Sequence, residues 1–233
     1  MRLNRKNHIL GKTSVDVFLK KYWQKKPLLI RNAIENFQSP ITEKDLFKIA
    51  QNEEAISRLI EFKKNLWQMK YGPFKKSDFP KKKNVPWTVL VQNINHHHSF
   101  ANFFLNLVKG MPEARRDDLM VSYATKEGSV GPHFDSYDVF LFQAKGEREW
   151  RISGQKEFAL DKKSAIKIIT NFKSKNSWVL KPGDMLYLPP NIGHWGVSQS
   201  DDCLTYSIGF RAPGTFEIQS KFLDFIQDSL ITN

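Results

Sequence analysis

The sequence has a single cysteine, few acidic residues and no long apolar run. Cys203 alone cannot form an intrachain disulfide, which fits a reducing compartment. Cys203 follows two aspartates in an acidic turn with no obvious base to activate the thiol, so we expect a buried thiol and not a nucleophile. No window supplies the about 20 apolar residues of a membrane-spanning helix, and no apolar run succeeds the charged N-terminus as it would in a signal peptide. We therefore expect a cytoplasmic protein without a membrane segment.

The shortage of acidic residues leaves 36 Lys+Arg against 24 Asp+Glu, a formal net charge of +12. Such a balance suggests a polyanionic neighbour such as RNA. A solvated basic surface explains the same charge equally well, and neither interpretation identifies a nucleic-acid-binding fold. The sequence is rich in apolar residues, with 40% hydrophobic and 13% aromatic residues. A chain of 233 residues with this composition can bury the core of one ordinary domain with appendages, or of two small domains.

Residues 1–116 are predicted to be a mixed region of helices and strands that packs on a barrel formed by the later residues. Ser14 suits the N-cap of a first helix, and Thr42 with Asp45 resembles the capping box of a second. Apolar spacing predicts helices at residues 14–25, 42–49, 53–60 and 99–108. β-rich runs predict strands at residues 28–30, 67–71 and 87–92. Residues 75–83 are basic and contain Pro80, so we expect an exposed loop there.

Residues 117–213 have a different pattern, in which short apolar runs are separated by Gly and Pro turns. Strands are predicted at residues 119–123, 133–135, 139–143, 149–152, 177–180, 184–188 and 204–210. Many short strands at even spacing are typical of a jelly roll, whose pocket lies between its two sheets. Residues 214–233 then predict one amphipathic C-terminal helix. The fold class expected is mainly β with flanking helices.

The stretch from Gly131 to Asp138 carries the strongest chemical signal in the chain. His133 and Asp135 are two residues apart, so in an extended strand both side chains face the same way. With His194 downstream they make two histidines and one carboxylate, the facial triad that binds iron(II) and leaves open positions. A His-x-Asp pair by itself is more often structural. The triplet 96–98 is a weaker candidate, because consecutive histidines on a helix or strand do not converge on one ion.

Strand parity extends this candidate site to further residues. The alternating sets that would share a cavity with the triad are Asp118, Met120 and Ser122; His133, Asp135 and Tyr137; and Thr205 with Ser207. Arg148 opens another predicted strand, and inside a barrel it would need an anion such as the carboxylate of a dicarboxylate co-substrate. The charges at 147, 149 and 151 favour instead a surface position for Arg148 on composition alone.

Together these motifs resemble the bacterial ribosomal oxygenases, which are JmjC-type, cupin-like protein hydroxylases dependent on iron(II) and 2-oxoglutarate. The segments that carry the resemblance are 18–27, 67–68, 71–74, 117–122, 130–140, 182–190 and 209–213. The resemblance implies a double-stranded β-helix in which His133, Asp135 and His194 are the catalytic iron ligands. It implies that Arg148 anchors the distal carboxylate of 2-oxoglutarate with help from Ser122. Thr205 stands where relatives usually have asparagine near the co-substrate, so its role there is an open point.

The resemblance also implies a substrate, namely an arginine of the sixteenth protein of the large ribosomal subunit. Asp118, Met120, Tyr137 and Ser207 match the positions that hold the substrate side chain. Without the resemblance, Asp118 would be expected to pair with Arg115 or Arg116.

Two other functions fit such a barrel: a non-catalytic cupin-like binding module, against which the intact triad argues, and a cupin metal enzyme without 2-oxoglutarate, against which Arg148 argues. The resemblance implies a dimerisation segment and a winged-helix domain beyond Asn233, the last residue of this sequence, so the oligomeric state is left open.

Overall fold

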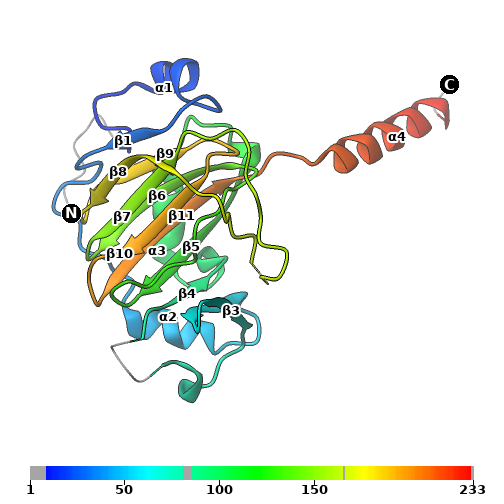
Figure 1. Cartoon of the computed structure of the whole chain (residues 1–233). Helices are drawn as coiled ribbons and strands as arrows, with labels where there is room; N and C mark the ends of the chain where they lie inside the picture. Colours follow the sequence, from blue (N-terminus) through cyan, green and yellow to red (C-terminus); the bar gives the residue numbers. More distant parts are fainter. Residues whose placement is uncertain (1–8, 81–84, 165, 232–233) are drawn as a thin grey trace.

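Two antiparallel sheets form the body of the protein, and the computed structural model describes residues 9–80, 85–164 and 166–231 (Figure 1). The strands are β1 (Leu28–Ile30), β2 (Ser57–Lys63), β3 (Leu66–Tyr71), β4 (Trp87–Val91), β5 (Arg116–Ala124), β6 (Asp138–Lys145), β7 (Arg148–Ser153), β8 (Ser174–Leu180), β9 (Met185–Leu188), β10 (His194–Ser198) and β11 (Cys203–Phe210). The larger sheet has the order β1-β9-β6-β11-β5-β4-β2-β3, and the smaller has the order β10-β7-β8. This is the predicted jelly roll.

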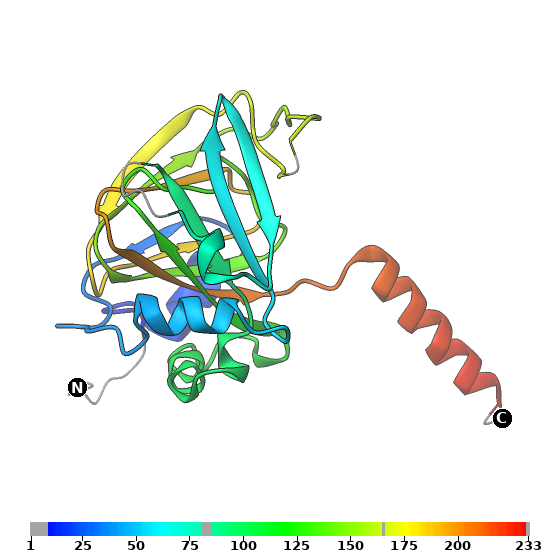
Figure 2. The same ribbon diagram turned by 90° about the horizontal axis from the view of Figure 1, so that it is seen from below.

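Helices cover one face of the larger sheet. They are α1 (Val15–Lys21), α2 (Glu43–Ala50) and α3 (Ser99–Asn106), with 3-10 turns η1 (Lys76–Asp78), η2 (Ile94–His96) and η3 (Glu113–Arg115). Their apolar side chains share one core cluster with the odd-numbered residues of β5, among them Leu119 and Val121. Figure 2 shows α2 and α3 on the side of the sheet away from β7 and β8. The even-numbered residues of β5 therefore face the space between the sheets.

Local sequence signals set several of these boundaries. The Ser14 side chain accepts from the Val17 N–H, and Thr42 forms the predicted capping box with Asp45. The first helix ends at Lys21, earlier than expected, and Gln24 beyond it has a φ of 57°. The helix predicted from Ser99 does begin there, but its N-cap is His98, whose Nδ1 accepts from the Phe100 N–H. Of the predicted basic loop, residues 81–83 lie outside the described residues.

The helix predicted at residues 53–60 is wrong. Residues from Ser57 onward form β2, which pairs with β3 on one side and β4 on the other. Lys64 and Asn65 have φ values of 53° and 60°, so they make a two-residue hairpin turn that aligns β2 with β3. Leu59 and Ile60 fit either a helical or an extended face, and strand pairing decides between them.

Two strand predictions in the jelly roll also need correction. Residues 133–135 form only an isolated bridge, between His133 and His194, and not a strand. The sequence does not predict β10, because five residues with Gly196 at their centre give no clear alternating pattern. The other predicted strands are present, with ends moved by a few residues.

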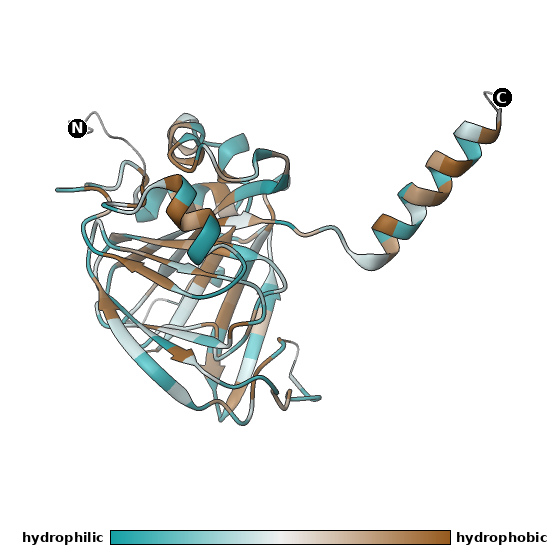
Figure 3. Ribbon diagram, turned by 90° about the horizontal axis from the view of Figure 1, so that it is seen from above, coloured by the Kyte–Doolittle hydropathy of each residue, from teal (hydrophilic) through white to brown (hydrophobic). Residues whose placement is uncertain are grey.

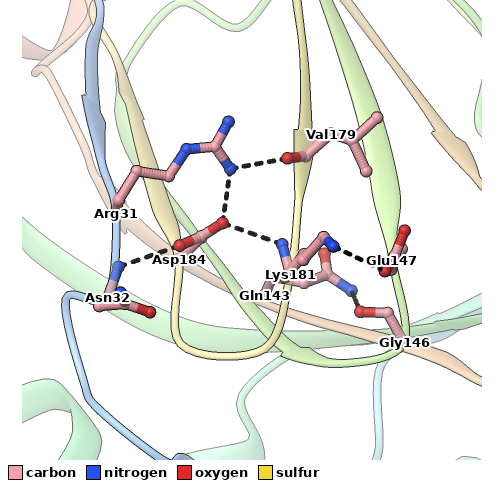
Figure 4. A network of polar contacts seen from close by, with 8 residues as sticks. All are labelled: Arg31, Asn32, Gln143, Gly146, Glu147, Val179, Lys181 and Asp184. Atoms are coloured by element: carbon pink, nitrogen blue, oxygen red, sulfur yellow. Dashed lines mark hydrogen bonds and ion pairs between the residues drawn. The ribbon is translucent and has the colours of Figure 1, made fainter.

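The turn between β8 and β9 is tied to β1 by a polar network around Asp184 (Figure 4). Arg31 Nη1 lies 2.6 Å from Asp184 Oδ2, and the Asn32 N–H donates to Oδ1 at 2.9 Å. The N–H of Lys181 donates to the same carboxylate at 3.0 Å. Asp184 thus belongs to the turn, and β9 begins at Met185, one residue later than predicted. Asp184 is only 4% exposed, and the donors of Arg31, Asn32 and Lys181 satisfy the hydrogen-bonding needs of its carboxylate.

A second, smaller core cluster fills part of the space between the sheets. It consists of Val139, Leu141, Trp150, Ile152, Leu180, Leu186 and Leu188. The rest of that space is left to polar side chains from β5, β7 and β11, and this is where the cavity lies. The strands of the N-terminal region complete the larger sheet, so they form one wall of the same space. The boundary placed at residues 116 and 117 stays a prediction.

The C-terminal helix α4 (Thr215–Ile231) extends away from the body (Figures 1 and 3). Its apolar side chains are exposed, among them Phe216 at 82% and Leu230 at 75%. Figure 3 shows apolar and polar residues mixed along this helix. Within the described ranges, no helix combines the length and the apolar character needed to cross a membrane.

Candidate active site

A cavity of about 600 Å³ opens between the two sheets. The lining side chains come from β2, β3, β4, β5, β6, β7, β10 and β11, from the loop after β5, and from the connecting residues 92, 166–167 and 211–212. All ten residues singled out from the sequence lie on its wall: Asp118, Met120, Ser122, His133, Asp135, Tyr137, Arg148, His194, Thr205 and Ser207. Strand parity explains the positions of Asp118, Met120 and Ser122 on β5 and of Thr205 and Ser207 on β11, because the other faces of these strands pack against the helices or the core. Residues 133–137 lie in the loop after β5 and all five line the cavity, so parity does not account for His133, Asp135 and Tyr137.

The predicted triad comes together at one point of this cavity. One ligand atom from each of His133, Asp135 and His194 lies within 4.8 Å of the other two. The two histidines exchange backbone hydrogen bonds, with N–O distances of 2.9 and 2.7 Å. The N–H of Asn191 donates to the carbonyl of Asp135 at 2.7 Å, which fixes the third residue against the same loop. Backbone pairing thus brings together residues far apart in the chain.

Each histidine of the triad is oriented by a bond to the backbone. Nδ1 of His133 is 2.9 Å from the carbonyl oxygen of Gly131, and Nδ1 of His194 is 2.9 Å from that of Ile192. A carbonyl can only accept, so Nδ1 carries the proton in both rings and the lone pair is left on Nε2. Nε2 of His194 lies 3.7 Å from Oδ2 of Asp135, so the lone pair faces the carboxylate. This is the tautomer that a metal ligand needs.

Burial lowers the pKa of His194 to about 4. The nearby His133 ring also lowers this pKa, while Asp135 acts in the opposite direction. His194 is therefore a neutral imidazole near pH 7, ready to donate its lone pair without first losing a proton.

Arg148 is buried, with 3% of its surface exposed, so the surface position favoured by composition is wrong. Its guanidinium lies over the Trp150 ring, 5.7 Å from the centroid. Nε and Nη2 are buried and have no hydrogen-bond partner among the described residues. Burying a cation and its donors without compensation is costly, so this position calls for an anion inside the cavity.

Ser122 and Thr205 face each other across β5 and β11, on the wall of the same cavity. Ser122 Oγ donates to the Thr205 carbonyl at 3.5 Å, a weak bond. Thr205 Oγ1 donates to Gln143 Oε1 at 3.2 Å, and the Gln143 amide donates in turn to the Lys145 carbonyl. Thr205 is thus held by a strand neighbour, while the Ser122 hydroxyl is only loosely engaged.

Asp118 does not pair with the arginines before it. The Arg115 guanidinium lies 3.4 Å from Asp138, and Arg116 donates to the Leu105 carbonyl. Asp118 instead accepts from the N–H of Asn93 at 2.7 Å, which holds its carboxylate at the cavity wall. Burial raises the pKa of Asp118, and the neighbouring Asp117 adds to this rise. A cation brought into the cavity would relieve both effects.

The remaining predicted residues form an apolar and hydroxyl-bearing wall of the cavity. Met120 Sδ lies 4.0 Å from Nη2 of Arg58, and Ser207 is buried. Burial raises the pKa of Tyr137, and the charge of Asp135 adds to the effect, so the phenol stays neutral.

The sequence interpretation missed the wall contributed by β2 and β4. Arg58 and Thr88 line the cavity, and Arg58 Nε and Thr88 Oγ1 are buried without a hydrogen-bond partner in the described part of the chain. Arg58 was missed because residues 53–60 were predicted to be a helix, and strand parity was not applied to them. Strand parity from Ile60 back to Arg58 would have found it, because both lie on the cavity face.

Comparisons with known proteins agree with this geometry. Residues 104–218 match the JmjC domain. The chain is 36% identical over 210 residues to the ribosomal protein uL16 3-hydroxylase of Escherichia coli K12, covering 90% of this chain and 56% of that one. It is 39% identical over 202 residues to a probable ribosomal oxygenase of Haemophilus influenzae, covering 85% and 50%.

The same fold is found among solved structures. The ribosomal oxygenase YcfD of Escherichia coli in complex with cobalt and 2-oxoglutarate superposes with a TM-score of 0.82 at 35% identity, over 94% of this chain and 57% of that one. The chain spans about half the length of the curated relatives it matches. The chain therefore carries a JmjC domain and, by sequence and by fold, is similar to the ribosomal oxygenases.

Proposed function

We propose that this protein is an iron(II)- and 2-oxoglutarate-dependent oxygenase that hydroxylates an arginine of the ribosomal protein uL16. The observation that carries the proposal is the pairing, within one cavity, of a two-histidine, one-carboxylate cluster with the buried guanidinium of Arg148. The relatives named for uL16 hydroxylation and for ribosomal oxygenase activity support the same reaction.

The donor set fits iron(II). His133, Asp135 and His194 would hold the metal through two neutral imidazoles and one carboxylate, which together occupy one face and leave the other open. When bound, iron(II) with 2-oxoglutarate supplies the activation of molecular oxygen, so that one oxygen atom enters the substrate C–H bond while 2-oxoglutarate becomes succinate and carbon dioxide. The backbone carbonyls of Gly131 and Ile192 keep both rings in position for this role.

Arg148 fits the far carboxylate of 2-oxoglutarate. Its two donors without partners among the described residues, Nε and Nη2, form the planar edge that binds a carboxylate bidentately. Trp150 packs against the guanidinium and shields that face from water. Ser122, with its loosely held hydroxyl, is placed to donate to the same anion.

The outer part of the cavity suits a cationic side chain. Three aspartates line it, but Asp117 is paired with Arg211 at 2.7 Å and Asp135 would bind the metal. Asp118 is the one that a substrate guanidinium would meet, and it is buried enough that a guanidinium would be a better partner than water. Tyr137 and Met120 would flank the aliphatic stem, with Ser207 as a further polar contact. The proposal places the protein in the cytoplasm beside the ribosome, where a net charge of +12 suits proximity to ribosomal RNA.

Two rival functions fit the cavity less well. A binding module would have no need of two imidazoles, those of His133 and His194, each held with its Nε2 lone pair available. A cupin metal enzyme without 2-oxoglutarate would have no use for a buried Arg148.

The test is succinate release from 2-oxoglutarate with iron(II), with and without peptides that span the arginines of uL16. Mass spectrometry should find one added oxygen on an arginine peptide and none on its lysine counterpart. The proposal requires that both signals vanish in His194→Ala. Succinate release without peptide hydroxylation would leave the oxygenase chemistry but exclude uL16 arginine as the target.

A further inference from the structure

The outer strand of the larger sheet has an open edge directly beside the cavity. β3 ends the strand order, and no other described strand pairs with its free side. Figure 2 shows the β2–β3 hairpin, in cyan, at the border of the sheet. An open edge presents unpaired backbone donors and acceptors to any extended chain that approaches it.

The hydrogen-bond pattern tells which residues of β3 carry these free groups. The N–H of Gly72 donates to the Ser57 carbonyl, so the Ser57–Gly72 pair is a hydrogen-bonded one. Bonded and non-bonded pairs alternate along an antiparallel ladder. The register of β2 with β3 then makes Lys70 and Gln68 bond to β2, while the N–H and C=O groups of Trp67, Met69 and Tyr71 point to the open side.

The same three residues also turn their side chains toward the reacting centre. Met69 and Tyr71 line the cavity, opposite Ile60 and Arg58 on β2. Trp67 shares their face, and its ring packs so closely over Gly131 that a Cβ there would lie 2.9 Å from Cε2. The carbonyl of that glycine holds a histidine of the triad. The free backbone edge thus runs along the cavity from its rim to the metal ligands.

β3 also lacks the features that usually protect an edge. Its one charged residue, Lys70, lies on the outer face, and neighbouring apolar residues are exposed, with Tyr71 at 68%, Leu66 at 56% and Phe62 of β2 at 44%. Natural edge strands are commonly blocked by inward charges, proline or bulges. An edge left open and apolar next to a cavity is the arrangement of domains that bind a peptide as an added strand.

We propose that an extended segment of the protein substrate adds to β3 as a further strand, bonding to the backbone of Trp67, Met69 and Tyr71. Every second side chain of such a segment points toward the sheet face that lines the cavity, and the others point outward. One inward side chain then enters the cavity toward Asp118, whose buried carboxylate favours a cation. This inference deepens the proposed function and rests on it for the identity of the substrate.

The first test removes one backbone donor and nothing else. Met69→Pro deletes an N–H that faces the open side, and proline is tolerated at such positions of edge strands because no ladder bond to β2 is lost. Met69→Ala is the matched control, since both variants lose the methionine side chain. Binding of labelled uL16 peptides, measured by fluorescence anisotropy with manganese in place of iron, should be about fivefold weaker for proline than for alanine, the loss of one hydrogen bond. Affinity for 2-oxoglutarate, measured on both variants, checks that the fold around Arg148 is intact.

The second test leaves the protein unchanged and alters the peptide. Backbone amides of the tightest-binding peptide are replaced by esters one at a time, which removes single N–H donors. Strand addition predicts weaker binding at every second position and no change between them. Equal effects at all positions, effects at none, or equal affinity of Met69→Pro and Met69→Ala would overturn the inference. Because binding is the readout, these outcomes are separate from failure of the proposed reaction, which would appear as bound peptide without hydroxylation.

A second copy of this chain could also occupy the edge. In that case the parent would self-associate, Met69→Pro would be monomeric, and peptide affinity would be the same in both. Sedimentation of the parent and both variants distinguishes this outcome, which also overturns the inference.

Discussion

The two ends of the cavity differ in how completely they are built. The deep wall, made of Ser122, Arg148, His194 and Thr205, is at most 6% exposed and holds donors that the described protein leaves unsatisfied. The outer wall, made of Met69, Tyr71, Asp117 and Asp118, is open at Tyr71 and bordered by a strand with an open edge. A rigid, desolvated site can bind a small ligand of constant shape, whereas an extended polypeptide binds at an accessible strand edge. The co-substrate and the protein substrate are therefore expected to be recognised by different physical means.

The largest effect is expected from removing a ligand of the triad. His133→Ala, Asp135→Ala and His194→Ala should each reduce succinate release below detection, because each residue supplies one of the three ligand atoms that lie within 4.8 Å of one another. Circular dichroism should show that the fold is retained. Full turnover by any of the three would sink the metal assignment.

Protonation of His194 should destabilise the metal-free protein in acid. Burial holds its pKa at about 4 in the folded state, against an ordinary value of 6.5. The free energy of unfolding is therefore highest above about pH 6.5, where His194 is neutral in both the folded and the unfolded state. It falls by a total of about 3 kcal/mol as the pH decreases toward 4, because only the unfolded state takes up the proton in this range. Urea unfolding of the metal-free protein across this range checks the slope. His194→Gln has no such group, so an identical slope in that variant would assign the effect to other residues.

Arg148→Lys probes the deep wall with the charge retained. Lysine is a point charge without the planar fork, so one of two parallel bonds to a carboxylate is lost. The KM for 2-oxoglutarate should rise about tenfold to a hundredfold, in keeping with a charge-assisted bond worth roughly 1.5–3 kcal/mol. The KM for the peptide should move much less. An unchanged KM for 2-oxoglutarate would point to Lys145 or Arg211 as the anchor.

Asp118→Asn probes the outer wall and should have the reverse pattern. The amide keeps an oxygen for the Asn93 N–H but has no charge for a guanidinium, so the KM for an arginine peptide should rise about tenfold. The KM for 2-oxoglutarate should stay as in the parent. Because burial raises the pKa of Asp118, this carboxylate should become protonated at a higher pH than an exposed aspartate. The difference in KM for the arginine peptide between the parent and Asp118→Asn should therefore begin to shrink at that higher pH. Equal arginine preference in parent and variant would remove Asp118 from substrate recognition.

The smallest effect is expected from α4. Nearly all its described side chains are exposed, so ending the chain after Gly214 removes little buried surface from the body. The free energy of unfolding should change by less than about 0.5 kcal/mol, the range of surface changes. Chemical denaturation of the shortened chain measures this, and a large loss would show that α4 packs on the body in solution.

Features that depend on neighbours along the chain were predictable. The caps at Ser14 and Thr42 act within three residues. The spacing of His133 and Asp135 pointed to two metal ligands, although residues 133–135 form an isolated bridge and not the strand from which that spacing was argued. The jelly roll was predictable from strand length and turn residues. The roles of Arg148 and Asp118 came from the family resemblance, because local charge favoured a surface arginine and a local ion pair.

The triad, the fold class and the alternation along β5 and β11 that turns Asp118, Met120, Ser122, Thr205 and Ser207 toward one cavity follow from the amino-acid order. Long-range contacts were needed to establish that residues from Ser57 form a strand, that Arg148 is buried over Trp150, and that Asp118 accepts from Asn93. The same contacts leave β3 at the edge of the described sheet. Periodicity and capping act between near neighbours, whereas burial, strand pairing and the partner of a buried charge depend on segments far apart in the chain.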